Sequence, residues 1–495
     1  MDGAIAPIAP RWASGRAEAR ARFAAAQAAG EGIRAYDAAA RDRRTRGWDR
    51  TASSANAENQ RARALLMWAG HDLVRNNKYA AAAVRQLVAT IWGDGIAVQI
   101  THPVKRIRDR AQSEWDRWAE SRVDGFGDWY GHGKVSVREM IVGGESLSFW
   151  LPDDGGPDGQ VIGLEGAHLD MGRSAPLRSG GRIVQGVEFA GLQRVAYWIF
   201  DEHPNDIVGP GTPSRRIDVG QIDHLFERLR HKQTRGVSWL GAVAMTLRDI
   251  GDIEDAKRLQ EKVQSCLALI VQPGEDMGGT SPLGQQAADP MGGAGRPLEE
   301  TLRPGMIARL GRGETASVVN PTPSASTVDF IRQQVAAVSA NMVPYHLMTG
   351  DVSQANYSGL RAAMNGSYSL VDDWQQNEVI PLLVKPAVRR RMKRLALEAR
   401  DPRFEQVGMT FALPIRRMVD PVKDLMGEIM EMRAGLKLLE TGLAERGINA
   451  EEHVARLKSM NDTIDRLGLA LDIDPRRVTD SGVLQTAAGF LAPRE

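Results

Sequence analysis

The sequence predicts an α+β fold that is mainly helical, and three observations indicate it. Apolar residues recur at helical spacing over several long segments. Between residues 135 and 230 they instead alternate with polar residues, as they do in strands. Hydrophobic residues make up 42% of the 495 positions, which is ample for sizeable cores. A chain of this length has room for about two to four domains.

The charge balance is close to neutral, with 63 basic and 62 acidic residues. This argues against tight electrostatic binding of nucleic acid by a single chain, because phosphate neutralisation needs a basic excess. DNA that slides past a nearly neutral surface remains compatible with it. Cys266 is the only cysteine, so no intrachain disulfide is expected, which fits a reducing cytoplasm. We expect no membrane span and no signal peptide, because the chain lacks a long apolar run.

Residues 1–60 are expected to form an arm with local basic character. One interpretation is a solvated, partly disordered leader. The other is an arm that contacts neighbouring subunits, a scaffold or nucleic acid. The arginines that give the arm its charge are Arg16, Arg20, Arg22, Arg41, Arg43, Arg44, Arg46 and Arg50.

Residues 61–92 predict a helix that ends at a Gly-Asp-Gly turn. Ile96–Ile100 follows as a short strand, and a second helix is expected over Val104–Arg122. Trp115 and Trp118 are three residues apart and would share one face of that helix. The eleven tryptophans lie mostly within apolar patterns, which favours core packing over base stacking.

Residues 135–230 predict a β-rich region. Alternating apolar residues on both sides of Ala190–Gln193 indicate a hairpin with its turn there. They are Val187 and Phe189 before the turn and Val195, Tyr197 and Ile199 after it.

Residues 240–271 predict a long amphipathic helix, broken near Gly251. Its apolar stripe consists of Leu240, Val243, Ala244, Leu247, Ile250, Ile253, Ala256, Leu259, Val263 and Cys266. Pro273–Pro297 follows with seven glycines and four prolines, a composition typical of flexible sequence. Short strands are expected at Ala268–Val271, Met306–Leu310 and Ala316–Val319, so a small β module would separate this helix from the next, Thr327–Met342.

The segment Asn341–Met364 predicts a loop between two helices. Pro344 disfavours helical geometry in the residue before it, Gly350-Asp351 indicates a turn, and Asn356 or Ser358 could cap the next helix. A long helical stretch is then expected from Ser358.

Prolines and caps mark the remaining helices. Pro381 and Pro386 should kink or interrupt the stretch that begins at Ser358. Asp420 and Pro421 are suited to begin a further helix, as N-cap and first helical residue. Asn449 and Glu452 resemble a capping box for another.

The sequence predicts no catalytic, metal or cofactor site, and hence a protein that is not an enzyme. Gly125–Ser136 is the best candidate for a phosphate loop. Asp128 stands where a Walker motif needs glycine, and Val135 stands where it needs Ser or Thr. Adjacent Asp372 and Asp373 would point apart on a helix.

The nine histidines are scattered, and none forms a known metal-binding motif. His224 and His231 lie near Glu227, in a segment that is expected to end a strand and lead into a loop. Packing or surface roles are therefore favoured over metal binding for both.

Several motifs, in the same order along the chain, resemble tailed-phage portal proteins of the lambda family. The match covers about Leu65 to Leu436, and extends in a weaker form to Arg477. The motifs read RNNKYAAAAVRQLVATIWGDGI with a nearby W-x-x-W, GGESLSFW, GVEF through AYWIF, VPYHLMTGD followed by NYSGLR, and DPVKDLMGEIMEMRAGL.

The resemblance implies a ring, typically of twelve subunits, at one capsid vertex, through which double-stranded DNA is packaged and ejected. It implies the terminase large subunit as a separate motor, which fits the missing Walker motif. Other implied partners are the major capsid protein, the scaffold and the neck or tail adaptors. The expected locations are the virion and, during assembly, the host cytoplasm.

The resemblance also implies a division into parts. They are an N-terminal arm (1–60), a wing (61–239 and 358–419), two stem helices (240–271 and 327–342), a clip (272–326), a tunnel loop (343–357), a helical crown (420–477) and a C-terminal tail (478–495). The Gly/Pro-rich insert is where this chain departs from the family pattern, in the length and order of the clip.

Two sets of site residues follow as hypotheses. In the tunnel loop, Asp351 would repel phosphate, Ser353, Gln354 and Asn356 would make weak polar contacts, and Arg361 would hold DNA transiently or pair with a neighbour's Asp351. Alternatively, Tyr357 and Arg361 only anchor the loop. The clip residues expected to meet the motor and neck are Arg296, Arg303, Arg309, Arg312 and Glu314.

Two other functions remain open at this point. One is a non-viral soluble α/β enzyme or binding protein with an unrecognised site. The other is a different head–tail adaptor, although such proteins are usually far shorter.

Overall fold

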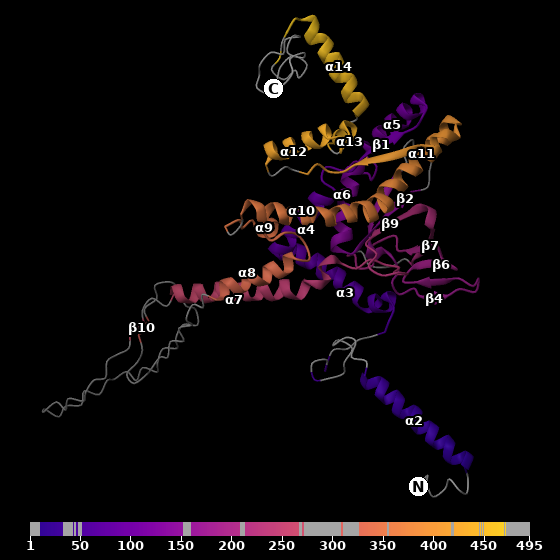
Figure 1. The fold of residues 1–495 in the computed structure, drawn as a ribbon, viewed down its shortest axis with the longest axis vertical. Helices are drawn as coiled ribbons and strands as arrows, with labels where there is room; N and C mark the ends of the chain where they lie inside the picture. Colours follow the sequence, from indigo (N-terminus) through magenta and orange to yellow (C-terminus); the bar gives the residue numbers. More distant parts are fainter. Residues whose placement is uncertain are drawn as a thin grey trace, which may run out of the picture. The chain divides into compact units, whose positions relative to one another are not determined.

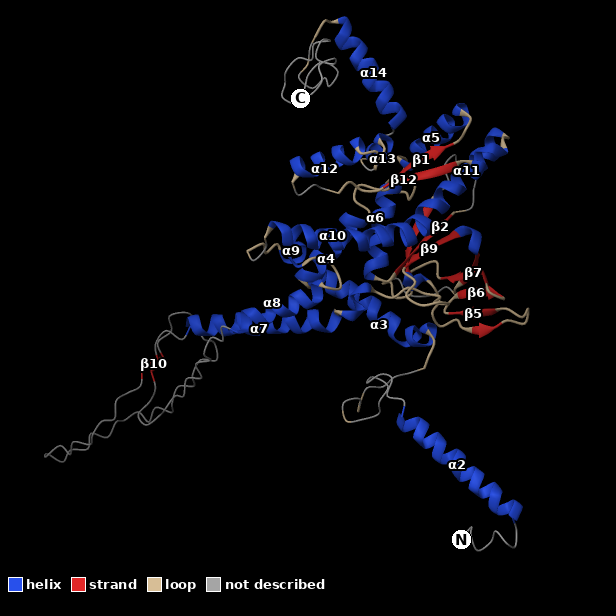
Figure 2. Cartoon of the chain, in the orientation of Figure 1, coloured by secondary structure: helices blue, strands red, loops and turns tan. Residues whose placement is uncertain are grey.

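The structure is a computed structural model, and it divides into two units, residues 1–54 and 55–495. It describes residues 10–32, 43, 46–47, 52–151, 160–207, 213–266, 270–271, 308–309, 326–353, 356–416, 420–444, 446, 448, 450–469 and 471. In the first unit, α2 (Pro10–Gly32) is a helix within the predicted arm (Figure 1). The second unit is mainly helical with several small sheets, as predicted (Figure 2).

The first predicted helix is in fact two helices. It begins earlier than expected, at the start of α3, and divides at Asn77. The Oδ1 atom of Asn77 accepts hydrogen bonds from the N–H groups of Tyr79 and Ala80, at 3.0 and 3.1 Å, and so begins a new helix. The helices of this part are α3 (Ala55–Asn76), α4 (Lys78–Ile91), α5 (Lys105–Ala119) and α6 (Trp129–Val142).

Helix α6 corrects the expectation that the β-rich region begins near residue 135. Asp128 is its N-cap, and the Asp128 carboxylate accepts a hydrogen bond from the N–H of Gly131 at 2.7 Å. Asp128, which stands where a phosphate loop needs glycine, is therefore the N-cap of a helix. The buried face of this helix includes His132, Gly133 and Ser136, whereas Val135 is exposed, so the apolar residues alone do not show the helical period.

Four tryptophans form the centre of the large core. Two of them, Trp115 and Trp118, have ring centroids 5.3 Å apart, which confirms the prediction that they share one face of their helix. Trp129 of α6 and Trp150 complete the group, with neighbouring centroids 5.5 to 6.2 Å apart. The group joins α5, α6 and strand β2 (Glu145–Trp150), so it holds the helical part against a sheet.

The strands form small sheets, and the predicted hairpin is present. Strands β6 and β7 pair through the turn that starts at Ala190 and ends at Gln193. The three-stranded sheet has the order β3–β2–β9, and the five-stranded sheet runs from β4 to β8 in sequence order. Their strands are β2 (Glu145–Trp150), β3 (Val161–Glu165), β9 (Ile222–Phe226), β4 (Ala175–Pro176), β5 (Arg182–Val184), β6 (Val187–Ala190), β7 (Gln193–Ile199) and β8 (Arg215–Asp218). The predicted strand at Ile96–Ile100 is β1 (Ala97–Thr101), which pairs with β12 (Gly408–Ala412).

A buried charge cluster joins α3 to the sheets. The Glu145 carboxylate lies at the start of β2, 2.8 Å from Arg235 Nε and 2.5 Å from Arg63 Nη2. All three side chains are almost completely buried. Burial would raise the pKa of Glu145, but the two arginines hold it well below its ordinary value. His224 Nε2 lies 3.1 Å from the same carboxylate, which places this histidine in a packing role.

Two long helices lie side by side in Figure 1, α7 (Ala244–Cys266) and α8 (Ser326–Ser339). The predicted break near Gly251 is wrong, because α7 runs through it. Glycine costs about 1 kcal/mol in a helix interior, and packing of the buried residues on this side offsets that cost. In α7 the buried residues of the predicted stripe are Leu247 and Ile250; Leu240 and Val243 are also buried but lie before the helix, which starts at Ala244. Further along the stripe, Leu259 is 63% exposed.

The prolines interrupt the long helical stretch as predicted. A π-helical segment, η5 (Gln375–Val384), contains Pro381 and joins α10 (Tyr357–Trp374) to α11 (Lys385–Ala399). Pro386 lies in the first turn of α11, where no intrahelical N–H donor is needed.

The C-terminal helices are α12 (Pro421–Arg433), α13 (Leu439–Ala444) and α14 (Ala450–Arg466). Asp420 caps α12 as predicted, since its carboxylate accepts the N–H of Lys423. Among the helices that could be described, none is long and apolar enough to span a bilayer.

Two predicted strands of the β module are present as β10 (Ile270–Val271) and β11 (Ala308–Arg309), which pair in parallel. The Gly/Pro-rich insert, the strand at 316–319 and the Asn449 cap lie outside the described residues.

Candidate functional site

The predicted loop between α8 and α10 contains a short helix, α9 (Tyr345–Thr349). Pro344 is at its N-cap position. Gly350 ends it with φ 74°, a left-handed conformation that glycine adopts without strain, and donates its N–H to His346 O at 2.9 Å. The loop is therefore more regular than its sequence suggested, and of the residues described after α9, 350–353 and 356 lie outside helices.

The Asp351 carboxylate accepts hydrogen bonds from both α8 and the loop itself. Arg332 Nη2 of α8 donates to Asp351 Oδ2 at 3.1 Å. Ser353 donates to Oδ1 from both its hydroxyl and its N–H, at 2.6 and 3.0 Å. These hydrogen bonds, first those from Ser353 and then the charge of Arg332, lower the pKa of Asp351 to about 2. Asp351 is thus a fixed anion with a defined orientation.

The end of the loop is bound to the helices that follow. Asn356 Oδ1 accepts the N–H of Gly359 at 2.6 Å, so it is the N-cap that the sequence predicted. Arg361 Nη2 donates to Asp424 Oδ1 of α12 at 2.7 Å. Lys423, also on α12, lies over the Tyr357 ring at 5.7 Å. Both Tyr357 and Arg361 therefore have partners on α12 of the same chain.

A pocket of about 390 Å³ lies between the loop and its flanking helices. The Arg332–Asp351 ion pair forms its charged side. The residues that line it are Arg332, Ala336, Tyr345, His346, Asp351, Asn356, Gly359, Leu360 and Ala363.

A larger groove, of about 1190 Å³, lies between α4, α6, α10 and the segment after β12. Its charged lining is mainly basic, with Asp94 as the one acidic residue among those that line it. Five cations line it, namely Arg85, Lys134, Arg138, Arg416 and Arg446. Two of them already have carboxylate partners, Asp372 for Arg416 and Glu428 for Arg446. The sequence pattern missed this groove because its cations come from distant segments.

Several predicted site residues lie outside the described residues. They are Gln354 in the loop and Arg296, Arg303, Arg312 and Glu314 in the predicted clip. Arg309 lies in β11, but its side chain is not among those described.

The paired carboxylates point apart, as predicted. Asp372 binds Arg416, whereas Asp373 accepts a hydrogen bond from Asn377 Nδ2 at 2.6 Å. The two groups do not share a substrate position in this arrangement.

The solved structures that resemble the chain include three particle assemblies. They are titled "Virion of native gene transfer agent (GTA) particle", "Neck of native GTA particle computed with C12 symmetry" and "Neck of empty GTA particle computed with C6 symmetry". The identities are 15%, 15% and 16%, and the TM-scores are 0.37, 0.37 and 0.36. The alignments cover 78%, 76% and 78% of this chain and 94%, 90% and 94% of the matched chains. TM-scores this low add nothing to the argument.

No curated protein matches the chain. The family model described as "Phage portal protein, lambda family" matches residues 41–375, more than half of the chain. The match includes all the motifs quoted above except Asp420–Leu436, and it begins inside the predicted arm. The chain therefore belongs to the lambda family of phage portal proteins.

Proposed function

We propose that this protein forms the ring at one capsid vertex through which double-stranded DNA is packaged and later ejected. The observation that carries the proposal is the family match over residues 41–375, which spans both long helices and the loop after them. Portal proteins are structural proteins, so the packaging motor would be a separate partner, the terminase large subunit.

The size of a helix supports a ring of twelve. Twelve helices side by side, each about 10 Å across, would form a ring about 38 Å in diameter through the helix axes. The remaining opening would be about 28 Å, wide enough for a duplex of about 20 Å. We assign α7 and α8 as the stem helices that surround this opening.

Exposed apolar side chains support contacts between copies of the chain. Large patches of this kind are unusual on a protein that acts alone. On α7 and α8 they are Met245, Leu259, Val328 and Phe330. On α12 and α14 they are Val422, Leu425, Met426, Met430, Val454, Leu457 and Met460. We propose that neighbouring subunits cover these residues, with α12 to α14 as the crown.

The loop around Asp351 would line the channel. Ring symmetry repeats each lining residue, so a single carboxylate becomes a collar of negative charge. Asp351 is suited to this because its pKa of about 2 keeps it ionised, although Arg332 at 3.1 Å offsets part of its charge in each copy. A collar of this kind would repel phosphate and prevent DNA from sticking, while Ser353, Gln354 and Asn356 offer exchangeable polar contacts.

The remaining parts follow the family plan. The clip would include β10 and β11 and would meet the motor, then the neck or tail adaptors, through Arg296, Arg303, Arg309, Arg312 and Glu314. The wing would combine residues 61–239 with 358–419 and face the capsid protein and scaffold. The arm would extend to a neighbour. The ring would thus belong to the virion and assemble in the host cytoplasm.

Imaging of the purified full-length protein in negative stain tests the proposal, together with its native mass. We expect rings with a central hole and a mass near twelve times 54.1 kDa. A stable monomer at the concentrations used for assembly would contradict the ring.

A further inference from the structure

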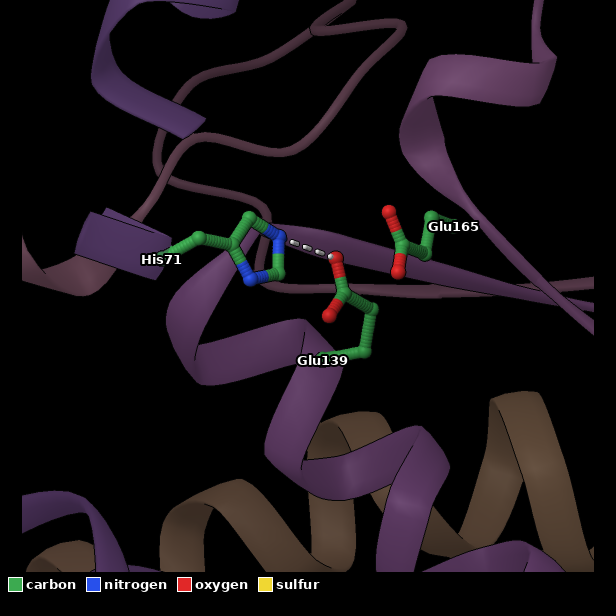
Figure 3. A group of neighbouring side chains, drawn as sticks. All are labelled: His71, Glu139 and Glu165. Atoms are coloured by element: carbon green, nitrogen blue, oxygen red, sulfur yellow. Dashed lines mark ion pairs between the residues drawn. The ribbon is translucent and has the colours of Figure 1, made fainter. Parts of the chain in front are cut away.

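Three side chains that could bind a metal ion come together from three separate elements (Figure 3). His71 lies on α3, Glu139 on α6 and Glu165 at the end of β3. One nitrogen or oxygen atom from each lies within 4.8 Å of the others. His71 Nε2 and Glu139 Oε1 are 3.3 Å apart. No local spacing in the sequence predicts this group, because its members are far apart along the chain.

The two closest atoms of the group lack hydrogen bonds. His71 Nε2 and Glu139 Oε1 are inaccessible to solvent, and neither has a hydrogen-bond partner in the described part of the chain. The dashed contact in Figure 3 is an ion pair whose geometry falls short of a hydrogen bond. The two atoms pair with each other at 3.3 Å, but buried polar atoms usually form hydrogen bonds, so a further partner between them would satisfy both.

The electrostatics of the group favour a cation as that partner. The Glu139 side chain is only 12% exposed, and its carboxylate lies within 4.8 Å of the Glu165 carboxylate, so two negative charges meet in a partly buried place. A divalent ion between the three groups would compensate the charge of both carboxylates.

Gly143 provides the space in which the Glu139 carboxylate lies. Its backbone has φ −83° and ψ −18°, which any residue adopts, so the conformation does not require glycine. A Cβ atom at this position would overlap Glu139 Oε1. The missing side chain therefore allows the carboxylate to point toward His71.

We propose that His71, Glu139 and Glu165 bind a divalent transition-metal ion of the zinc type, with water as the fourth ligand. Bonds of about 2.0 to 2.2 Å in a tetrahedral site place neighbouring ligand atoms about 3.3 to 3.5 Å apart. The separation of His71 and Glu139 already matches this, and Glu165, within 4.8 Å of both, has to approach by at most about 1.5 Å. Glu165 is half exposed at a strand end, so a change of its side-chain rotamer can bring the carboxylate closer. A nitrogen ligand favours zinc over magnesium.

His203 would position Glu165 from outside the metal site. Its Nε2 lies 3.8 Å from Glu165 Oε2. Such outer partners orient metal ligands and raise affinity. The ion would tie α3, α6 and β3 together, and so stabilise the part of the subunit that carries the sheets.

Calorimetric titration with Zn²⁺ tests the proposal on the full-length protein, after metal has been removed with a chelator. We expect one Zn²⁺ per chain, a higher melting temperature with Zn²⁺ than without, and no comparable effect of Mg²⁺. His71→Ala and Glu139→Gln should each weaken binding by at least about tenfold. His231→Ala is the matched control, because His231 is an exposed loop histidine, and it should bind like the wild type.

Two further measurements distinguish Zn²⁺ binding at this site from binding elsewhere on the protein. Gly143→Ala removes no ligand but displaces the Glu139 carboxylate, so it should weaken Zn²⁺ binding while the circular dichroism spectrum stays unchanged. Co²⁺ bound at this site should show visible bands without a thiolate charge-transfer band, because Cys266 is not a ligand. Equal Zn²⁺ affinity in the wild type, His71→Ala and Glu139→Gln would overturn the proposal, as would a Co²⁺ spectrum with thiolate bands.

Discussion

Arg332 of α8 and Asp351 of the loop form an ion pair, with Nη2 and Oδ2 3.1 Å apart. The pair joins the loop to the helix that precedes it. At the other end, Arg361 joins the start of α10 to Asp424 of α12. The loop is thus held at both ends, and residues 352–355 are the part between these attachments.

Deletion of Val352–Ala355 should leave ring assembly intact and impair the passage or retention of DNA. The deletion spares Arg332, Asp351 and Arg361, so the attachments of the loop remain. Negative-stain images would show whether rings form, and nuclease protection of packaged DNA would measure retention. Normal packaging and retention in the deletion variant would rule out a gating role for this loop.

Features that depend on neighbouring residues, such as turns and helix caps, could be predicted from the sequence, whereas contacts between distant segments could not. The hairpin around Ala190–Gln193 and the caps at Asn356 and Asp420 follow from local residues, so a pattern could find them. The end of the first helix at Asn77 was missed because its apolar stripe continues across the cap.

The candidate sites also differ in how much of each could be predicted from local sequence. The loop was predictable from Pro344 and Gly350, whereas its ion pairs with Arg332 and Asp424 were not. Neither the cluster around Glu145 nor the basic groove has a sequence signature, because each gathers residues more than 80 positions apart. Their partners are set by tertiary packing alone.

Glu145→Gln should destabilise the subunit strongly. The change leaves Arg63 and Arg235 buried without their carboxylate, and breaking a buried ion pair in this way costs about 3 to 5 kcal/mol. Urea unfolding followed by circular dichroism measures the free energy of unfolding. Glu398→Gln is a suitable control, because Glu398 pairs with Arg394 on the surface of α11. The control should change stability by less than about 1 kcal/mol, and equal effects of the two changes would contradict the role of Glu145.

His132→Gln should reduce the loss of stability in mild acid. His132 Nε2 lies 2.9 Å from Ser148 Oγ, and burial lowers the pKa of His132 from 6.5 to about 4. Between these two pKa values the unfolded chain binds a proton at His132 and the folded chain does not. The contribution of His132 to the free energy of unfolding is therefore fully present above pH 6.5. It falls by roughly 3 kcal/mol as the pH decreases toward 4.

His224, whose pKa is also lowered to about 4, contributes in the same pH range, so His132→Gln should remove only part of the decline. Urea unfolding at a series of pH values measures it. His231→Gln, in an exposed loop, should keep the wild-type profile. A wild-type pH dependence in His132→Gln would show that this residue does not carry the effect.

Met430→Asp should weaken ring assembly without unfolding the subunit. Met430 on α12 is 63% exposed in the single chain, so a charge there costs little until a neighbour covers it. We expect a lower native mass with an unchanged circular dichroism spectrum. Glu431→Gln on the same helix is the matched control and should form normal rings. Intact rings in Met430→Asp would place the interface elsewhere.

Arg361→Ala and Asp424→Asn should have the same effect, because the first removes the contact between α10 and α12 and the second removes the negative charge that holds it. The Arg361 side chain is 45% exposed and that of Asp424 is 18% exposed, so their coupling is expected to be roughly 0.2 to 1 kcal/mol. A double-mutant cycle on thermal stability measures the coupling, and the double variant should add little to either single change. DNA retention should fall equally in both single variants, because both release the end of the loop. If only Arg361→Ala impairs retention while Asp424→Asn behaves as the wild type, Arg361 contacts DNA and its anchoring role is secondary.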